Sequence, residues 1–165
     1  MQNIGGCMEV LDLYDDNFNK LDKKIVRRVD EIPEHTNIMQ SYILIKNNGK
    51  YLLEQSTEKN NFRWSIPGGH VLTNETPEMG LNRELKEELN ISNLSYKKID
   101  TVKFPYNKFI FNVFYSEDLI DLNSLSFQKE EVIQVNWFTK EEILKLIEEE
   151  KIARGYAFIL NKYMD

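Results

Sequence analysis

Three glutamates at helical spacing are the residues of this chain best placed to do chemistry together. Residues three and four apart are neighbours on a helix, so Glu84, Glu87 and Glu88 would share one face. Their negative charges repel one another unless a cation joins them. Magnesium prefers oxygen ligands, keeps several waters and often bridges to substrate phosphates. The spacing therefore indicates a metal site for phosphate chemistry, with a solvated acidic helix face as the alternative.

The segment that must position these glutamates carries the signals of a helix with defined ends. The Thr76 hydroxyl can cap the amino end, and Pro77 suits the first helical position, where no N–H donor is needed. Asn90 tolerates the left-handed conformation that often ends a helix. Leucines recur every fourth residue on an adjoining face and predict the buried side of the helix: Leu81, Leu85 and Leu89.

The stretch from Gly69 to Ile91 resembles the Nudix box. That box reads Gly, five residues, Glu, seven residues, Arg-Glu, an apolar residue, any residue, Glu-Glu, any residue, Gly and an apolar residue. The matching residues here are Gly69, Glu75, Arg83, Glu84, Leu85, Glu87, Glu88 and Ile91. The one departure is Asn90 in place of glycine, and both residues accept positive φ. The similarity continues upstream through residues 64–68 and more weakly over most of the chain.

The resemblance implies a role for each polar residue of the box. Glu84, Glu87 and Glu88 would bind divalent cations, Mg²⁺ or Mn²⁺, together with the carbonyl of Gly68. Arg83 keeps its proton, so it can pair with a neighbouring glutamate and fix its direction, and Glu75 would orient groups in the same way from the loop. The predicted catalytic residues are Glu84, Arg83, Glu87 and Glu131.

The general base is left open between two places in the sequence. Glu84 is one candidate. The other is a glutamate just before a late strand, where many members of the family supply a further acid. Here the segment offers Glu130 and Glu131, and the Val-x-x-Val-x-Trp pattern that follows favours Glu131.

Substrate contacts are predicted outside the helix. His70 follows the box glycine, and a structural or substrate-contacting role is expected for it rather than acid–base catalysis. Loops and strand ends supply further candidates, of which aromatic residues can stack on a base but more often belong to a core. The predicted substrate-binding residues are Arg63, His70, Lys103 and Tyr106.

The remaining segments predict strands and helices that interleave without strict alternation. A hairpin is expected over residues 9–28, with its turn at 15–17 and its returning strand near 24–28. Asn48-Gly49 between apolar runs is a strong signal for a second hairpin. Strands are predicted at 40–45, 51–55, 63–66, 94–102, 109–115 and 132–138, and helices at 139–150 and 156–164.

This order fits a mixed sheet held between helices. The resemblance implies the same fold class: an α/β protein, the α/β/α Nudix sandwich with mixed sheet and an added N-terminal β-hairpin. One domain over residues 1–165 is expected, and residues 1–7, which have little pattern, are expected to be a disordered extension.

The composition of the chain limits the classes of partner that it can bind. A net charge of −6 argues against a nucleic-acid polymer as partner, whereas a small diphosphate substrate remains compatible if metal ions supply positive charge. No apolar run is long enough for a membrane span, and a single cysteine, Cys7, excludes an internal disulfide. A cytoplasmic location is expected. Homodimers are common among the relatives that the resemblance implies, and the sequence leaves the oligomeric state open.

Three functions follow from these observations. The first is metal-dependent hydrolysis of a diphosphate linkage in a nucleoside diphosphate derivative or related metabolite, the pyrophosphohydrolase activity that the resemblance implies. The second is an isomerase, because residues 11–17 and Gly69-His70-Val71 look like the branch related to isopentenyl-diphosphate isomerase. That isomerase needs a cysteine ahead of the box, where this chain has Trp64-Ser65-Ile66-Pro67. The third is a non-catalytic nucleotide sensor, against which the retained acids argue.

Overall fold

The computed structural model describes residues 8–165, so the expected N-terminal extension, residues 1–7, lies outside the described part. The strands are β1 (Val10–Tyr14), β2 (Lys20–Val26), β3 (Ile38–Asn47), β4 (Lys50–Ser56), β5 (Trp64–Ser65), β6 (Gly68–His70), β7 (Lys97–Lys103), β8 (Phe109–Ser116) and β9 (Val132–Thr139). The helices are α1 (Pro77–Leu89), α2 (Lys140–Glu148) and α3 (Arg154–Tyr163), with short 3-10 turns at Glu58–Asn60 and Leu122–Ser124.

A mixed sheet forms the centre of the molecule, as the sequence predicts. Five strands follow the order β5-β4-β3-β8-β7, while β6 adds to β3 and β9 adds to β4. The β3–β8 pair is parallel, with Ile38 opposite Phe109 and Ile45 opposite Ser116, and the other pairs are antiparallel. Buried parallel strands read as continuous apolar runs, which explains the sequence of β3.

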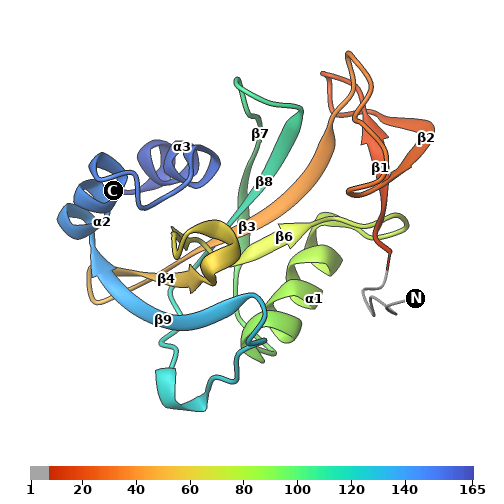
Figure 1. Cartoon of the computed structure of the whole chain (residues 1–165). Helices are drawn as coiled ribbons and strands as arrows, with labels where there is room; N and C mark the ends of the chain where they lie inside the picture. The colour runs from red at the N-terminus through yellow and green to blue at the C-terminus, as the bar shows by residue number, and fades with distance from the viewer. Residues whose placement is uncertain (1–7) are drawn as a thin grey trace.

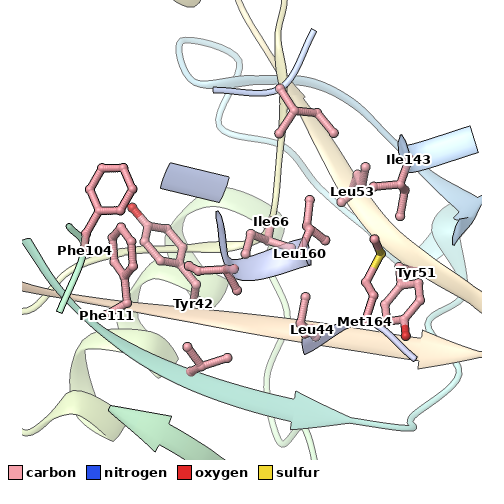
Figure 2. Close-up of a cluster of buried hydrophobic side chains, with 13 residues drawn as sticks. Tyr42, Leu44, Tyr51, Leu53, Ile66, Phe104, Phe111, Ile143, Leu160 and Met164 are labelled. Carbon is pink, nitrogen blue, oxygen red and sulfur yellow. The ribbon is translucent and has the colours of Figure 1, made fainter. Parts of the chain in front are cut away.

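Two helical layers cover the two faces of this sheet (Figure 1). Because side chains alternate along a strand, Ile43 and Ile45 face α1, whereas Tyr42 and Leu44 face α2 and α3. Figure 2 shows the second of these cores, in which Tyr42, Phe104 and Phe111 form one end and Leu44, Tyr51 and Met164 the other. The same alternation on β4 places Leu53 in the second core and Leu52 against α1.

The ends of α1 are those predicted. The Thr76 hydroxyl accepts a hydrogen bond from the Met79 N–H at 3.1 Å, and Asn90 ends the helix with φ of 58°. The Ile91 N–H donates to the Leu85 carbonyl, which completes the left-handed cap. The predicted stripe is buried: Leu81, Leu85 and Leu89.

Both predicted hairpins are present. The turn between β3 and β4 has positive φ at Asn48 (50°) and Gly49 (73°), as a two-residue hairpin turn requires. In the N-terminal hairpin β2 runs from Lys20 to Val26 and not near 24–28, because the Asp15 carboxylate accepts from the N–H groups of Asn17 and Asn19 and closes the turn early. The two residues after β2, Arg27 and Arg28, therefore lie in a turn.

Other boundaries also differ from the predicted ones: β3 extends two residues beyond each end of the predicted strand, and α2 ends at Glu148 and not near 150. The strand expected from residue 94 begins at Lys97, since the backbone of Ser95 is bound by the side chains of Asp118 and Ser116. Helix α3 begins at Arg154, two residues early, after an Ala153 cap that offers no side-chain signal.

Within residues 8–165, no helix combines the length and the apolar character that crossing a bilayer requires.

Candidate functional site

Two glycines bring β6 against the acidic helix. A Cβ at Gly68 would lie 2.0 Å from the Ser41 carbonyl oxygen, and one at Gly69 would lie 2.5 Å from the Glu84 carboxyl carbon. Gly68 also has φ of 140°, which side-chain-bearing residues rarely adopt. Glycine at position 69 lets the backbone approach Glu84 this closely, and glycine at position 68 lets it pack equally closely on β3.

Arg83 ties the loop before α1 to the glutamates on the helix. Its guanidinium donates to Glu75 (3.0 Å), Glu84 (3.0 Å) and Glu87 (3.3 Å), and Nη2 donates to the His70 carbonyl at 2.8 Å. Glu75 also accepts from the Leu72 N–H. The side chain of Glu84 is thereby fixed in direction, in the manner that the sequence predicts for Arg83 and Glu75.

The three helical glutamates face a common space with different exposure. All three line a cavity of about 510 Å³, which we call the acid cavity. The side chain of Glu84 is 10% exposed and that of Glu87 is 54% exposed, so Glu87 lies at the rim. Burial raises the pKa of Glu84, and the Arg83 guanidinium opposes this rise.

Glu54 is a buried acid beside Glu88 that the sequence reading missed. It follows Leu52 and Leu53 on β4, and alternation along the strand turns it toward α1. The carboxyls of Glu54 and Glu88 are close enough to influence each other, and burial raises the pKa of both, that of Glu54 to about 7. A glutamate within the mostly apolar strand predicted at 51–55 was the signal in the sequence that could have identified Glu54.

The donor set around this pair fits a hard divalent cation. Oε2 of Glu54 is buried without a hydrogen-bond donor, and the neighbouring acid can supply one only when protonated. Within residues 8–165 no three His, Cys, Asp or Glu side chains are already gathered as a metal cage. Arg83 holds Glu84 and Glu87, whereas one carboxylate oxygen of Glu54 is left without a partner. Oxygen-only ligands of this kind suit Mg²⁺ or Mn²⁺.

A second cavity of about 520 Å³ adjoins the first, and we call it the sheet cavity. Glu88, Gly68 and His70 line both cavities, whereas Glu54 and Arg63 line only the sheet cavity. The predicted metal-binding residues and Arg63 therefore border connected space between the sheet and the 3-10 turn at Glu58–Asn60.

Glu131 reaches both cavities from the segment before β9. It lines each of them and forms an ion pair with Lys59, whose Nζ lies 3.4 Å from Oε1. Glu130 lines neither cavity, and its carbonyl accepts from the Thr57 hydroxyl. Of the two acids that the sequence offers here, Glu131 is the one that the fold brings to the box glutamates.

His70 is partly buried. Burial and the neighbouring Arg27 guanidinium lower its pKa to about 4. Its Nε2 lies 3.1 Å from the Gln40 side-chain nitrogen, which can donate to the neutral ring. This geometry suits a structural or substrate-contacting histidine.

The two remaining predicted contacts lie on the β7–β8 hairpin, with different surroundings. Tyr106 lines a third cavity of about 410 Å³, the aromatic cavity, and its ring lies 4.4 Å from the Arg154 guanidinium carbon. The Lys103 ammonium instead donates to the carbonyls of Phe104 and Asn107, and Lys103 lines none of these three cavities. The structure therefore does not bring Lys103 together with the other predicted residues.

The aromatic cavity shares walls with the sheet cavity. Gln40, Tyr42 and Tyr156 border both of them. The Tyr42 and Tyr156 rings meet edge to face with centroids 5.2 Å apart. Sequence reasoning missed these residues because buried aromatic residues in strands and helices look like core.

Arg27 and Arg28 also line the acid and sheet cavities. They follow β2 of the N-terminal hairpin, far from the box in sequence, and nothing near them in the sequence indicates that they reach it.

Comparisons with known proteins agree with this geometry. The family profile described as NUDIX domain matches residues 39–158. An 8-oxo-dGTP diphosphatase of Haemophilus influenzae is 38% identical over 69 residues, which cover 41% of this chain and 51% of that protein. The chain thus spans about half the length of that curated relative.

Solved structures show the same fold at low sequence identity. A Deinococcus radiodurans protein has a TM-score of 0.78 and 21% identity, covering 95% of this chain and 100% of its own. A MutT protein of Methanosarcina mazei has a TM-score of 0.58 and 25% identity, covering 75% of this chain and 89% of its own. With the profile match over most of its length, this chain belongs to the NUDIX domain family.

Proposed function

We propose that this chain is a divalent-cation-dependent pyrophosphohydrolase that cleaves a diphosphate linkage in a nucleoside diphosphate derivative or a related small metabolite. The observation that carries the proposal is the convergence of four acids from three parts of the chain, β4, α1 and the segment before β9, on connected cavities: Glu54, Glu84, Glu88 and Glu131. Burying such acids side by side is costly unless a cation joins them.

The proposed roles follow from position. Glu54, Glu84 and Glu88, with Glu87 at the rim and the Gly68 carbonyl, would hold Mg²⁺ or Mn²⁺. When bound, the cation shields the charge of the diphosphate and polarises its oxygens, so that water can attack phosphorus. Arg83 and Glu75 keep the direction of Glu84 fixed in this proposal.

Glu131 is the proposed general base. Its carboxylate is partly exposed, and its ion-pair partner, Lys59, is an exposed side chain. The carboxylate is therefore accessible to water, unlike those of the buried acids. Water would lose a proton to this carboxylate while its oxygen forms a bond to phosphorus and the bridging P–O bond breaks. Glu84 is the alternative base, but its carboxylate is already held by Arg83.

The aromatic cavity is the proposed site of the organic part of the substrate. Its walls include Phe104, Tyr106 and Tyr156, and the amides of Gln40 and Asn107 lie among them. Aromatic surface with a few polar groups suits a nucleobase. Arg63 and His70 would contact the substrate between this cavity and the acids.

A metal-dependent phosphate-release screen, in which the organic products and pyrophosphate are also separated and identified by chromatography, tests the proposal. Purified protein is assayed with Mg²⁺, with Mn²⁺ and with excess chelator against nucleoside triphosphates including 8-oxo-dGTP, nucleotide sugars, ADP-ribose, dinucleoside polyphosphates and isopentenyl diphosphate. Turnover that disappears with chelator and returns with cation supports the proposal. Full activity in excess chelator contradicts it, and isomerisation of isopentenyl diphosphate without hydrolysis would favour the isomerase.

A further inference from the structure

The N-terminal hairpin places two arginines beside the acids of the proposed active site. Arg27 and Arg28 line both the acid cavity and the sheet cavity, although they precede the family match, which begins at residue 39. The hairpin packs on the main sheet through Leu11, Leu13 and Ile25 against Ile38. In Figure 1 the hairpin lies at the end of the molecule beside β6 and α1. The fold therefore adds positive charge to a cavity whose family-matched part supplies acids.

The two guanidinium groups have different partners. Arg27 Nη1 lies 2.6 Å from Glu9 Oε2, and the Arg27 side chain remains 33% exposed. Arg28 is exposed, and among residues 8–165 no side-chain hydrogen bond or ion pair engages its guanidinium. Neither arginine pairs with Glu54, Glu84 or Glu88 within that range, so both retain donors for a ligand.

Arg28 also occupies a backbone conformation that suits another residue better. Its φ is 67°, in the left-handed region that glycine and asparagine adopt more readily than arginine. Residues held in such conformations are frequent at ligand sites. The backbone therefore does not explain why arginine stands at this position.

We infer that Arg27 and Arg28 form a binding subsite for a terminal phosphate group of the substrate. A terminal phosphate carries close to two negative charges and three unesterified oxygens, which match two guanidinium groups. A phosphate esterified on both sides carries one charge and offers two free oxygens. The subsite thus selects nucleoside di- or triphosphates over diphosphates flanked by two organic groups. This inference rests on the proposed function.

Binding of two non-hydrolysable ligands tests the subsite. Calorimetry in Mg²⁺ compares ADP with a methylene bridge, which has a terminal phosphate, and methylene-bridged ADP-ribose, which has none. Arg27→Gln and Arg28→Gly are each expected to weaken binding of the ADP analogue at least about tenfold, because each removes a charge-assisted hydrogen bond. The ADP-ribose analogue should change by less than about threefold, since only long-range charge is lost.

Two control variants separate binding from structure. Glu9→Gln removes the ion pair of Arg27 but keeps both arginines, and Lys23→Gln removes an exposed cation from β2, the strand that precedes them. Lys23→Gln should leave the two affinities nearly unchanged, and Glu9→Gln, which removes a negative charge from the lining of the acid cavity, should weaken neither. Arg28→Gly relieves the positive φ, so its melting temperature should equal or exceed that of the unaltered protein while its affinity falls.

Several outcomes overturn the subsite. The subsite is refuted if the arginine variants weaken binding of both ligands equally, or weaken neither. It is also refuted if the unaltered protein does not bind the ADP analogue, or if Glu9→Gln weakens binding as much as Arg27→Gln does. The phosphate-release screen reports separately on the proposed function. If binding depends on the arginines but no substrate is turned over, hydrolysis is refuted and the subsite stands. If substrates are turned over but both arginine variants have an unchanged KM for nucleoside diphosphates, only the subsite is refuted.

Discussion

At the scale of single residues, the energetics of this protein centre on carboxylates that the fold packs together. Glu54 is buried on β4 directly after Leu52 and Leu53, and Glu88 lies near it on α1. Two buried acids cannot both ionise cheaply, because burial disfavours the charged form and the charges repel. The apo protein therefore holds a proton at this pair that an unfolded chain would release.

The first prediction concerns the stability of the cation-free protein against pH. The folded pKa of Glu54, about 7, lies above its ordinary value of 4.5, so the folded state binds more protons between these values. Stability should be greatest at the acidic end of this window and fall as pH rises through it, by on the order of 2–3 kcal/mol. Glu54→Gln should reduce this fall and melt higher than the unaltered protein at pH 8, while Glu88, whose pKa burial also raises, keeps the rest of the pH dependence. The measurement is a series of thermal melts in chelator from pH 5 to 8.

A matched control uses Glu87, which is half exposed and lies at the rim of the same cavity. Glu87→Gln should leave the pH dependence of the melts nearly as it is. An unaltered slope in Glu54→Gln would show that Glu54 does not hold the proton.

The second prediction separates ligands from scaffold. Glu84→Gln and Glu88→Gln keep size and remove charge, so each should lower turnover by on the order of a hundredfold or more if these acids hold the cation. Neither change should destabilise the cation-free protein, because buried like charges repel. Steady-state rates and melts of the two variants give the answer. If either variant unfolds without cation yet has normal turnover when folded, the acids are structural and the proposed mechanism is wrong.

At the scale of secondary structure, α1 carries the site because both of its ends and its buried face are well defined. Thr76, Pro77 and Asn90 set its limits, and three leucines set its rotation against the sheet. That rotation turns Glu84 and Glu88 toward β4 and β6.

The third prediction tests the buried face of this helix. Leu85 is 2% exposed among Ile43, Leu52 and Phe114. Leu85→Ala should lower the free energy of unfolding by about 2–5 kcal/mol, since it removes buried methyl groups and leaves a cavity. Denaturant titration measures the loss, and turnover per folded molecule should be retained. A loss below about 1 kcal/mol would mean that the leucine stripe does not anchor the helix.

The fourth prediction tests the end of α1, where the family has glycine. Asn90→Gly removes the penalty of a side chain at φ of 58° but also the hydrogen bond from Lys86 Nζ, which is 2.7 Å long and exposed. These effects oppose each other, so the free energy of unfolding should change by no more than about 1 kcal/mol. Turnover should stay nearly unchanged. Greatly reduced turnover in a folded Asn90→Gly variant would assign Asn90 a role beyond the helix cap.

At the scale of the whole molecule, the site is assembled from four separate parts of the chain. The N-terminal hairpin gives Arg27 and Arg28, β4 gives Glu54, α1 gives the box acids, and the segment before β9 gives Glu131. A ligand that bridges these parts should bind the folded state alone and stabilise it.

The fifth prediction follows from that coupling. Free Mg²⁺ at ten times its dissociation constant should stabilise the fold by about 1.4 kcal/mol at 25 °C. At one fixed Mg²⁺ concentration the gain should be larger at pH 8 than at pH 6, because at pH 6 the cation must displace a proton held by Glu54 or Glu88. Thermal melts with and without Mg²⁺ at both pH values measure it, with Glu88→Gln as the variant that should lose most of the gain. An equal shift in Glu88→Gln would place the cation elsewhere.

The sequence by itself determined the features that depend on neighbours along the chain. Helical spacing puts Glu84 and Glu88 on one face, Thr76 and Asn90 bound their helix, and Asn48-Gly49 forms a turn. Each of these follows from local backbone geometry, which a few consecutive residues control. For the same reason the mixed sheet between helices was predictable, with strand ends shifted where distant side chains bind the backbone.

Only the tertiary structure decided which distant residues join the helix. Glu54 reaches Glu88 because β4 pairs with β3 beneath α1, and Arg27 reaches the same cavity because the hairpin docks on Ile38. Lys103 fails to reach it because nearby carbonyls hold its ammonium. Such outcomes depend on how strands pair and helices pack across long separations in sequence, and no spacing rule within one segment encodes them.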